Sequence, residues 1–366
     1  MPSLISSITP DLQPEFLQVV DYIYRRMVNL QKGANVLILT DSRMPRKTVI
    51  AFQGVAMMMG AEVMVAENRH ALPIPLQPSD KWNNMVKAAS READIIVDMA
   101  VGYGDFMQEF TERGGVVVSP GDGPGGWCTE ESLIRTMLHV DLEALKVEAE
   151  HIAELFTEAK TCYVTSEEGT DFEIDIGDLK GDSYDGFLWD FERQEYRTSF
   201  VFLPPAQPGV IVPRGRGDGV IALDAVIQAD PAFGQDYPES PVFVTIEKGR
   251  VVDIAGNGFS ADRLRIWLES LNSDQSWNGP VHINIGNNPR ARFSEISEFE
   301  RVRGVITFGM GDVSVLSGVL GLADDMEGNL AAPAHWDVVM KRPSLRLDDK
   351  IVSENGIIRS ELPPVG

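Results

Sequence analysis

The fold of the first half of the chain is indicated by ANVLILT, residues 34–40, an apolar run of the length of one buried strand. Residues 16–31, which come before it, have apolar side chains at helical spacing. A second helical pattern follows between residues 49 and 59, and AEVMVA, residues 61–66, then indicates another strand. A strand, a helix and a second strand in this order form a βαβ unit, whose two strands are normally parallel.

The same alternation continues toward residue 150. Apolar runs at residues 93–98 and 115–119 predict two more strands, and a long helical pattern extends from about Asp141 to Glu158. We therefore expect an α/β N-terminal domain over residues 1–160, built around a doubly wound parallel sheet.

The pattern changes after Lys160. Residues 161–165 and 171–176 alternate between polar and apolar side chains on either side of a turn, and residues 242–254 form a hairpin-like pair of strands. A helix is predicted near residues 260–272. These features indicate an α+β, mostly antiparallel C-terminal domain over residues 161–366, which would also be the metal-binding catalytic domain.

Composition excludes several classes of protein. The 366 residues are 43% hydrophobic, which is enough for two substantial cores, and the formal net charge of −23 disfavours a nucleic-acid partner. The only two cysteines, Cys128 and Cys162, favour a reducing compartment. No basic leader and no apolar run of roughly 20 residues is visible, so we expect a cytoplasmic protein that does not bind membranes.

Two weaker motifs precede the second half of the chain. The stretch GDGPGG, residues 121–126, matches a phosphate-binding pattern in form only, because it follows the fourth predicted strand and Pro124 removes one backbone amide. We expect a loop near a cleft instead. His70 follows a predicted strand end, where α/β loops often meet ligands, and it is kept as a minor candidate.

Two histidines and one aspartate form the strongest candidate site. His282 lies in VHINIG, and His335 and Asp337 lie in AHWD, so all three fall in strand-like segments. Alternate residues of a strand face the same side, and His335 and Asp337 can therefore bind one metal ion together. Two imidazoles and a carboxylate are the ligand set of mononuclear non-haem iron sites. The alternative is that each histidine only hydrogen-bonds a neighbour inside its strand.

The sequence around these residues resembles that of the aminopeptidase T (thermophilic metalloprotease) family. The matching stretches are GTDF at 169–172, VHINIGNNPRA at 281–291, APAHWD at 332–337 and LDD at 347–349. In the branch that resembles 2,5-dihydroxypyridine 5,6-dioxygenase, a histidine replaces the metal-bridging glutamate of the peptidases, and His282 stands at that place. The peptidases are also expected to have a histidine ligand where this chain has Thr307, so the resemblance disfavours a two-metal peptidase.

The resemblance implies a ring-cleaving dioxygenase of aromatic catabolism. Its cofactor would be one Fe(II) held by His282, His335 and Asp337, and its partners would be a small hydroxylated aromatic or N-heterocyclic substrate and O2. A homo-oligomer is expected on the same basis. Two alternatives stay open: a hydrolase of a small amide or ring substrate that uses Zn2+ or Mn2+ at the same three residues, and a scaffold without enzymatic activity.

Acid–base residues are harder to identify. Ring-cleaving relatives are expected to use further histidines, but this chain has none between residues 151 and 282. We expect Glu195, with Tyr196 beside it, to take that catalytic role, and Arg292 to meet an anionic substrate. The alternative for Glu195 is an ion pair with a neighbouring arginine at the surface, and Arg292 has a similar alternative.

Overall fold

The computed structural model describes residues 12–41, 44–68, 84–99, 105–120, 130–230, 233–293, 298–313 and 332–359. These residues form two compact units. Unit 1 contains the described parts of residues 1–139 together with residues 186–204. Unit 2 contains residues 140–185 and the described parts of residues 205–366. The glycine-rich stretch 121–126 and His70 lie outside the described residues.

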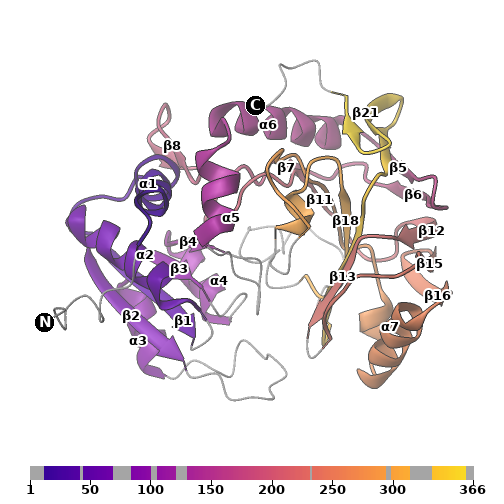
Figure 1. Ribbon diagram of the computed structural model, residues 1–366, viewed down its shortest axis with the longest axis horizontal. Helices are drawn as coiled ribbons and strands as arrows, with labels where there is room; N and C mark the ends of the chain where they lie inside the picture. Colours follow the sequence, from indigo (N-terminus) through magenta and orange to yellow (C-terminus); the bar gives the residue numbers. More distant parts are fainter. Residues whose placement is uncertain are drawn as a thin grey trace, which may run out of the picture. The chain divides into compact units, whose positions relative to one another are not determined.

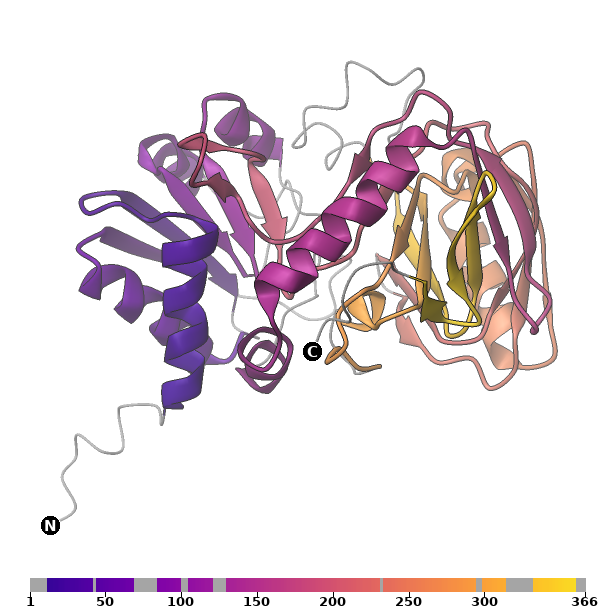
Figure 2. The ribbon, with the colours of Figure 1, turned by 90° about the horizontal axis from the view of Figure 1, so that it is seen from above.

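Unit 1 is built on a parallel sheet. Its described strands follow the order β10-β4-β3-β1-β2, and the adjacent pairs are parallel. Figure 2 shows these strands side by side with helices on both sides. The parallel sheet predicted for the N-terminal half is thereby confirmed. The elements are α1 (Pro14–Tyr22), the π-helical turn η2 (Ile23–Met27), β1 (Asn35–Asp41), α2 (Arg46–Met58), β2 (Glu62–Asn68), α3 (Asn84–Glu92), β3 (Ile95–Asp98), α4 (Asp105–Glu112), β4 (Val116–Ser119), α5 (Glu130–Leu133), the π-helical turn η3 (Ile134–Leu138), β8 (Trp189–Asp190), β9 (Glu195–Tyr196) and β10 (Phe200–Phe202).

The edge strand β10 was not expected from the sequence. It belongs to the second half of the chain, yet Phe200 pairs with Val117 and Phe202 pairs with Ser119 in parallel register. A three-residue strand has too few side chains to show a period, and its partner lies about 80 residues earlier, so no local pattern reports the pairing. Unit 1 therefore depends on a segment that the chain contributes after it has begun unit 2.

Unit 2 contains two antiparallel sheets. Within the described residues the first has the strand order β14-β13-β19-β18-β17-β11-β7, and the second has the order β16-β15-β12-β6-β5-β20-β21-β22. Figure 1 labels most of these strands. The first sheet comprises β7 (Gly181–Asp182), β11 (Gly209–Ile211), β13 (Val226–Asp230), β14 (Gly234–Asp236), β17 (His282–Ile285), β18 (Ile306–Gly311) and β19 (His335–Met340). The second comprises β5 (Thr161–Thr165), β6 (Asp171–Asp175), β12 (Asp218–Leu223), β15 (Val242–Glu247), β16 (Arg250–Gly256), β20 (Ser344–Leu347), β21 (Lys350–Glu354) and β22 (Ile357–Ile358).

The helices of unit 2 agree with the sequence patterns. The long α6 (Leu142–Glu158) begins at Asp141, whose side chain accepts a hydrogen bond from the backbone N–H of Ala144 and so caps the first turn. It packs against β7 and β11. The other helices are α7 (Phe259–Ser270) and the 3-10 helices η4 (Asp274–Trp277) and η5 (Phe299–Arg301).

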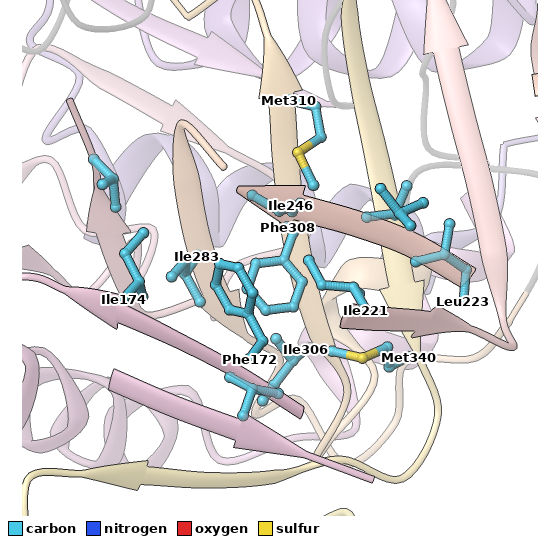
Figure 3. Close-up of a cluster of buried hydrophobic side chains, with 14 of the residues drawn as sticks. Phe172, Ile174, Ile221, Leu223, Ile246, Ile283, Ile306, Phe308, Met310 and Met340 are labelled. Atoms are coloured by element: carbon cyan, nitrogen blue, oxygen red, sulfur yellow. The ribbon is translucent and has the colours of Figure 1, made fainter. Parts of the chain in front are cut away.

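The two sheets of unit 2 enclose one apolar core. Phe172 of β6 meets Phe308 of β18 edge to face, with ring centroids 5.3 Å apart, and Figure 3 shows both rings among buried isoleucines and methionines. Along β17, β18 and β19 every second residue points into this core, including Ile283, Phe308 and Trp336. The residues between them point to the opposite face of the first sheet.

Candidate metal centre

The opposite face of β17, β18 and β19 carries the three residues that the sequence singled out. His282 pairs with Gly309, Gly309 pairs with Asp337, and His335 pairs with Gly311. Paired residues in antiparallel strands share a face, and residues two apart in one strand share it too. The antiparallel register therefore places the side chains of His282, His335 and Asp337 on one side of the sheet.

The three side chains converge at one point. The Nε2 atom of His282 lies 3.2 Å from Oδ1 of Asp337, and Nε2 of His335 lies 3.1 Å from Oδ2 of the same carboxylate. The two Nε2 atoms are 3.4 Å apart, and the rings are stacked. One ligand atom from each residue lies within 4.8 Å of the ligand atoms of the other two. This is the spacing expected around a single metal ion.

The far nitrogen of each ring has its own acceptor. Nδ1 of His282 lies 2.6 Å from Oδ1 of Asn284, and Nδ1 of His335 lies 2.5 Å from the backbone oxygen of Asp312. When Nδ1 donates its proton to these oxygens, the lone pair of a neutral ring stays on Nε2, where a metal ion can use it.

Gly309 leaves the space that the imidazole ring of His282 occupies. A Cβ atom at Gly309 would lie 1.9 Å from Nε2 of His282 and 2.1 Å from Cδ2. No side chain fits there unless the imidazole moves away. A glycine inside a buried strand is destabilising by itself, so its presence indicates a close approach, here that of a ligand ring.

The charges at the site favour a cation. Burial lowers the pKa of His335, but Asp337 and, to a smaller extent, Asp312 together outweigh burial and raise the pKa to about 9. Burial raises the pKa of Asp337, yet the two histidines hold it well below its usual value. Oδ1 of Asp337 is buried and accepts no hydrogen bond within the described part of the chain. Two nitrogen lone pairs and an ionised carboxylate around one point fit a divalent metal.

The same face carries further polar groups, beside a buried apolar cluster that includes Val226 and Val339. Gln228 of β13 pairs with Asp337 and shares its face, and Oε1 of Gln228 accepts a hydrogen bond from Nε2 of Gln235 at 2.9 Å. Thr307, which lies two residues before Gly309 in β18, pairs with Asn284 of β17 and is fully buried. Amide and hydroxyl groups of this kind orient small polar substrates in enzyme sites.

The other predicted site residues are not members of this three-residue cluster. Glu195 and Tyr196 form β9 in unit 1, where both are exposed and Tyr196 packs edge-on against Trp189. Burial, and secondarily the charge of Asp94, raises the pKa of the Tyr196 hydroxyl. Arg292 is an exposed residue of unit 2, after β17. The catalytic roles of these residues remain predictions.

Sequence reasoning missed three contributors to the site. Asn284 is two residues from His282 in the same strand, and that spacing alone could have suggested it. Gly309 is a glycine inside an apolar strand, which is a recognisable sign of close approach. The contribution of Asp312 comes from its backbone carbonyl, and no side-chain pattern reports such an atom.

A two-histidine, one-carboxylate cluster on a sheet of this kind defines a class of enzymes that can use one bound metal ion. Comparisons with known proteins specify the class. The family model described as 2,5-dihydroxypyridine 5,6-dioxygenase matches residues 24–360. A 2,5-dihydroxypyridine 5,6-dioxygenase from Pseudomonas putida (strain KT2440) is 22% identical over 359 residues, which cover 94% of this chain and 95% of the relative.

Solved structures show the same fold. The 2,5-dihydroxypyridine dioxygenase from Pseudomonas putida KT2440 matches with a TM-score of 0.74 and 20% identity, over 94% of this chain and 97% of that one. Wild-type AmpT from Thermus thermophilus matches with a TM-score of 0.63 and 14% identity, over 94% and 99%. The resemblance inferred from the sequence is confirmed.

This chain belongs to the 2,5-dihydroxypyridine 5,6-dioxygenase family, because the family model spans nearly its whole length. It is therefore an enzyme of the dioxygenase class. Among the described residues, none of the helices combines the length and the apolar character that crossing a membrane requires.

Proposed function

We propose that this enzyme opens the ring of 2,5-dihydroxypyridine or a closely related hydroxylated N-heteroaromatic compound, with O2 as co-substrate. One Fe(II) would be held by His282, His335 and Asp337. The observation that carries the proposal is the convergence of these three side chains, two of them buried, on one point within the described chain. The family match supports a dioxygenase reaction at that point.

Fe(II) held by His282, His335 and Asp337 would supply the redox chemistry that the reaction of a hydroxylated ring with O2 needs. Residues of the chain would balance the charge of the metal and orient its nitrogen ligands. Asp337 balances positive charge, and Asn284 and Asp312 keep both Nε2 lone pairs directed at the metal position. His282 and Asp337 are at most 8% exposed, so they hold this position in a largely water-excluded part of the sheet.

The proposal is tested by loading the metal-free enzyme with Fe(II) under anaerobic conditions and then adding 2,5-dihydroxypyridine and O2. Oxygen uptake should match substrate loss, and with 18O2 the product should contain both labelled atoms. A panel of related dihydroxypyridines and phenols would rank substrates. Absence of uptake with every compound, together with Zn2+- or Mn2+-dependent hydrolysis in the absence of oxygen, would show that the enzyme is a hydrolase instead.

Proton transfer is proposed for Glu195, assisted by Tyr196, and substrate-anion binding for Arg292. Glu195→Gln and Tyr196→Phe should then lower kcat, and Arg292→Ala should raise KM. Steady-state oxygen uptake measures each effect. Unchanged kinetics in all three variants would show that these residues are only surface groups. The expected homo-oligomer is checked by light scattering of the purified protein.

A further inference from the structure

A buried chain of hydrogen bonds begins at one of the two candidate ligand rings. Nδ1 of His282 meets Oδ1 of Asn284 at 2.6 Å, and Nδ2 of Asn284 donates to the backbone oxygen of Gln207 at 2.9 Å. Asn284 is 5% exposed, so bulk water does not compete for either bond. Both ends of its side-chain amide are therefore engaged inside the protein.

The chain continues to a buried ion pair. Nε2 of Gln207 donates to Oε2 of Glu300 at 2.6 Å, and the same oxygen accepts a bond from Arg301 at 2.8 Å. Glu300 and Arg301 are almost completely buried. The Gln207 side chain thus ties its loop to the buried Glu300–Arg301 pair on η5. The Gln207 carbonyl is therefore held in place as the partner of the Asn284 amide.

These contacts determine which way the Asn284 amide points. Its NH2 group must face the Gln207 carbonyl, because two oxygens 2.9 Å apart would repel one another. Its oxygen must then face His282, where it can only accept. The His282 ring is consequently required to carry a proton on Nδ1, which leaves Nε2 as the nitrogen that faces Asp337 and His335.

The second ligand ring is held differently. His335 rests on the backbone oxygen of Asp312. That group is present whatever side chain occupies the position. The orientation of His282, in contrast, depends on a single side-chain amide. Of the two ligand rings, His282 is therefore the one that a substitution beside it can release.

We propose that Asn284 is a positioning residue that selects the metal-binding tautomer and orientation of His282, with Gln207 and the Glu300–Arg301 pair as its anchor. The role deepens the proposed function, since it rests on His282 being a metal ligand. Loss of an outer hydrogen-bond partner of a metal-bound histidine typically weakens metal binding about 10- to 100-fold. The same loss is expected for Asn284.

The experiment compares variants of the full-length enzyme with Co(II) as the probe, by competition with a chromophoric chelator. Asn284→Leu has a similar size but no acceptor, and its Co(II) affinity should fall about 10- to 100-fold. Asn284→Asp keeps an oxygen opposite Nδ1 but sets its second oxygen against the Gln207 carbonyl, so its affinity should fall less than that of Asn284→Leu, by under about tenfold. Asn287→Leu is the matched control, because Asn287 is equally buried in the same unit but bonds to Glu148 rather than to a ligand ring.

A second measurement does not require metal. In metal-free enzyme labelled with 15N-histidine, long-range NMR spectra report which ring nitrogen of His282 carries the proton, with the signal assigned from its loss in His282→Gln. The unsubstituted enzyme and Asn284→Asp should show protonated Nδ1. Asn284→Leu, if folded, should show both tautomers, and circular dichroism checks its fold.

The outcomes separate this inference from the proposed function. No Co(II) binding by the unsubstituted enzyme would contradict the metal site itself. Normal binding by the unsubstituted enzyme, with equal losses in Asn284→Leu and Asn287→Leu, would show that Asn284 only supports the fold. If Asn284→Leu does not fold, the result rests on Asn284→Asp: a loss of affinity below about tenfold with protonated Nδ1 supports the role, and a loss as large as about 100-fold overturns it.

Discussion

The two faces of β17, β18 and β19 differ in chemistry around the candidate centre, although the same strands form both. One face carries Ile283, Phe308 and Trp336 and packs into the core between the sheets of unit 2. The other carries His282 and Asp337, with the His282 ring lying over Gly309. All residues of β17 and β18 are buried, so exposure to water does not distinguish the faces.

The difference lies in what each face requires from its neighbours. The core face needs only apolar volume, which many residue combinations can provide. The metal face needs a particular atom at each place, because a buried polar group without its partner is costly. Substitutions on the two faces should therefore separate stability from metal binding, and the following predictions test that separation.

Asp337→Asn should have the largest effect on function. Removing the only carboxylate of the candidate centre leaves two neutral imidazoles, and metal affinity should fall by more than about 100-fold, beyond the loss of an outer partner. Oxygen uptake should become undetectable. Above pH 9, where His335 is neutral in either protein, the thermal unfolding of the metal-free enzyme should shift little in comparison with a core substitution. Retained metal content after dialysis would contradict the assignment of Asp337 as a ligand.

Gly309→Ala tests the same face without changing a donor. The added methyl group would overlap the imidazole of His282, so the ring must swing away and the metal site should be lost. Overpacking of this kind typically costs about 1–3 kcal/mol in unfolding free energy.

Gly54→Ala is the matched control for Gly309→Ala. Gly54 lies inside α2, where a Cβ would meet nothing within 4 Å. This variant should gain about 0.5–1 kcal/mol in stability and keep its metal affinity. Chemical denaturation and Co(II) titration measure the two properties separately. Normal Co(II) binding by Gly309→Ala would show that the ring does not need this space.

Phe308→Ala tests the opposite face at the neighbouring position of β18. The ring is fully buried against Phe172, and its removal should reduce the free energy of unfolding by about 3–5 kcal/mol. The folded fraction should bind Co(II) with nearly unchanged affinity. Urea denaturation followed by metal titration in the absence of urea distinguishes the two effects. A large loss of affinity in folded protein would mean that the faces are not independent.

Proton competition should produce the most gradual effect, because it changes metal affinity step by step with pH. Without metal, the pKa of His335 is about 9, so the ring must lose a proton to bind a cation below that pH. Apparent metal affinity should fall about tenfold for each pH unit below 9. Calorimetry in buffers of different ionisation enthalpy detects the released proton. In metal-free enzyme the charged His335–Asp337 pair stabilises the fold fully below pH 6.5, and this contribution is lost as pH rises through 9.

Most elements with a clear local period could be predicted from the sequence. The helix after Asp141 and the hairpin near residue 248 were both identified from spacing and turn residues. The antiparallel character of the second half followed from alternation. The short strand β10 could not be found this way, because its stability comes from pairing with β4 and not from its own composition.

The candidate centre could be predicted only in part. His282, His335 and Asp337 were found because the chain has only 5 histidines, two of them in strand-like segments, and because the sequence around them resembles a known family. Their mutual distance depended on strand register, which joins residues more than 50 positions apart. Asp312 contributes its backbone oxygen, and Gly309 contributes by having no Cβ atom. Both become visible only when the strands are placed side by side.

The return of the chain to unit 1 at β10 has a practical consequence for dissecting this enzyme. A fragment that stops near residue 160 would lack β10 and would expose the hydrogen-bonding edge of β4, an arrangement that promotes association between sheets. Conversely, cutting out residues 186–204 would interrupt the connection between β7 and β11 in unit 2. Neither unit can be produced by a single cut, so expression of either part alone requires joining segments that are separate in the gene.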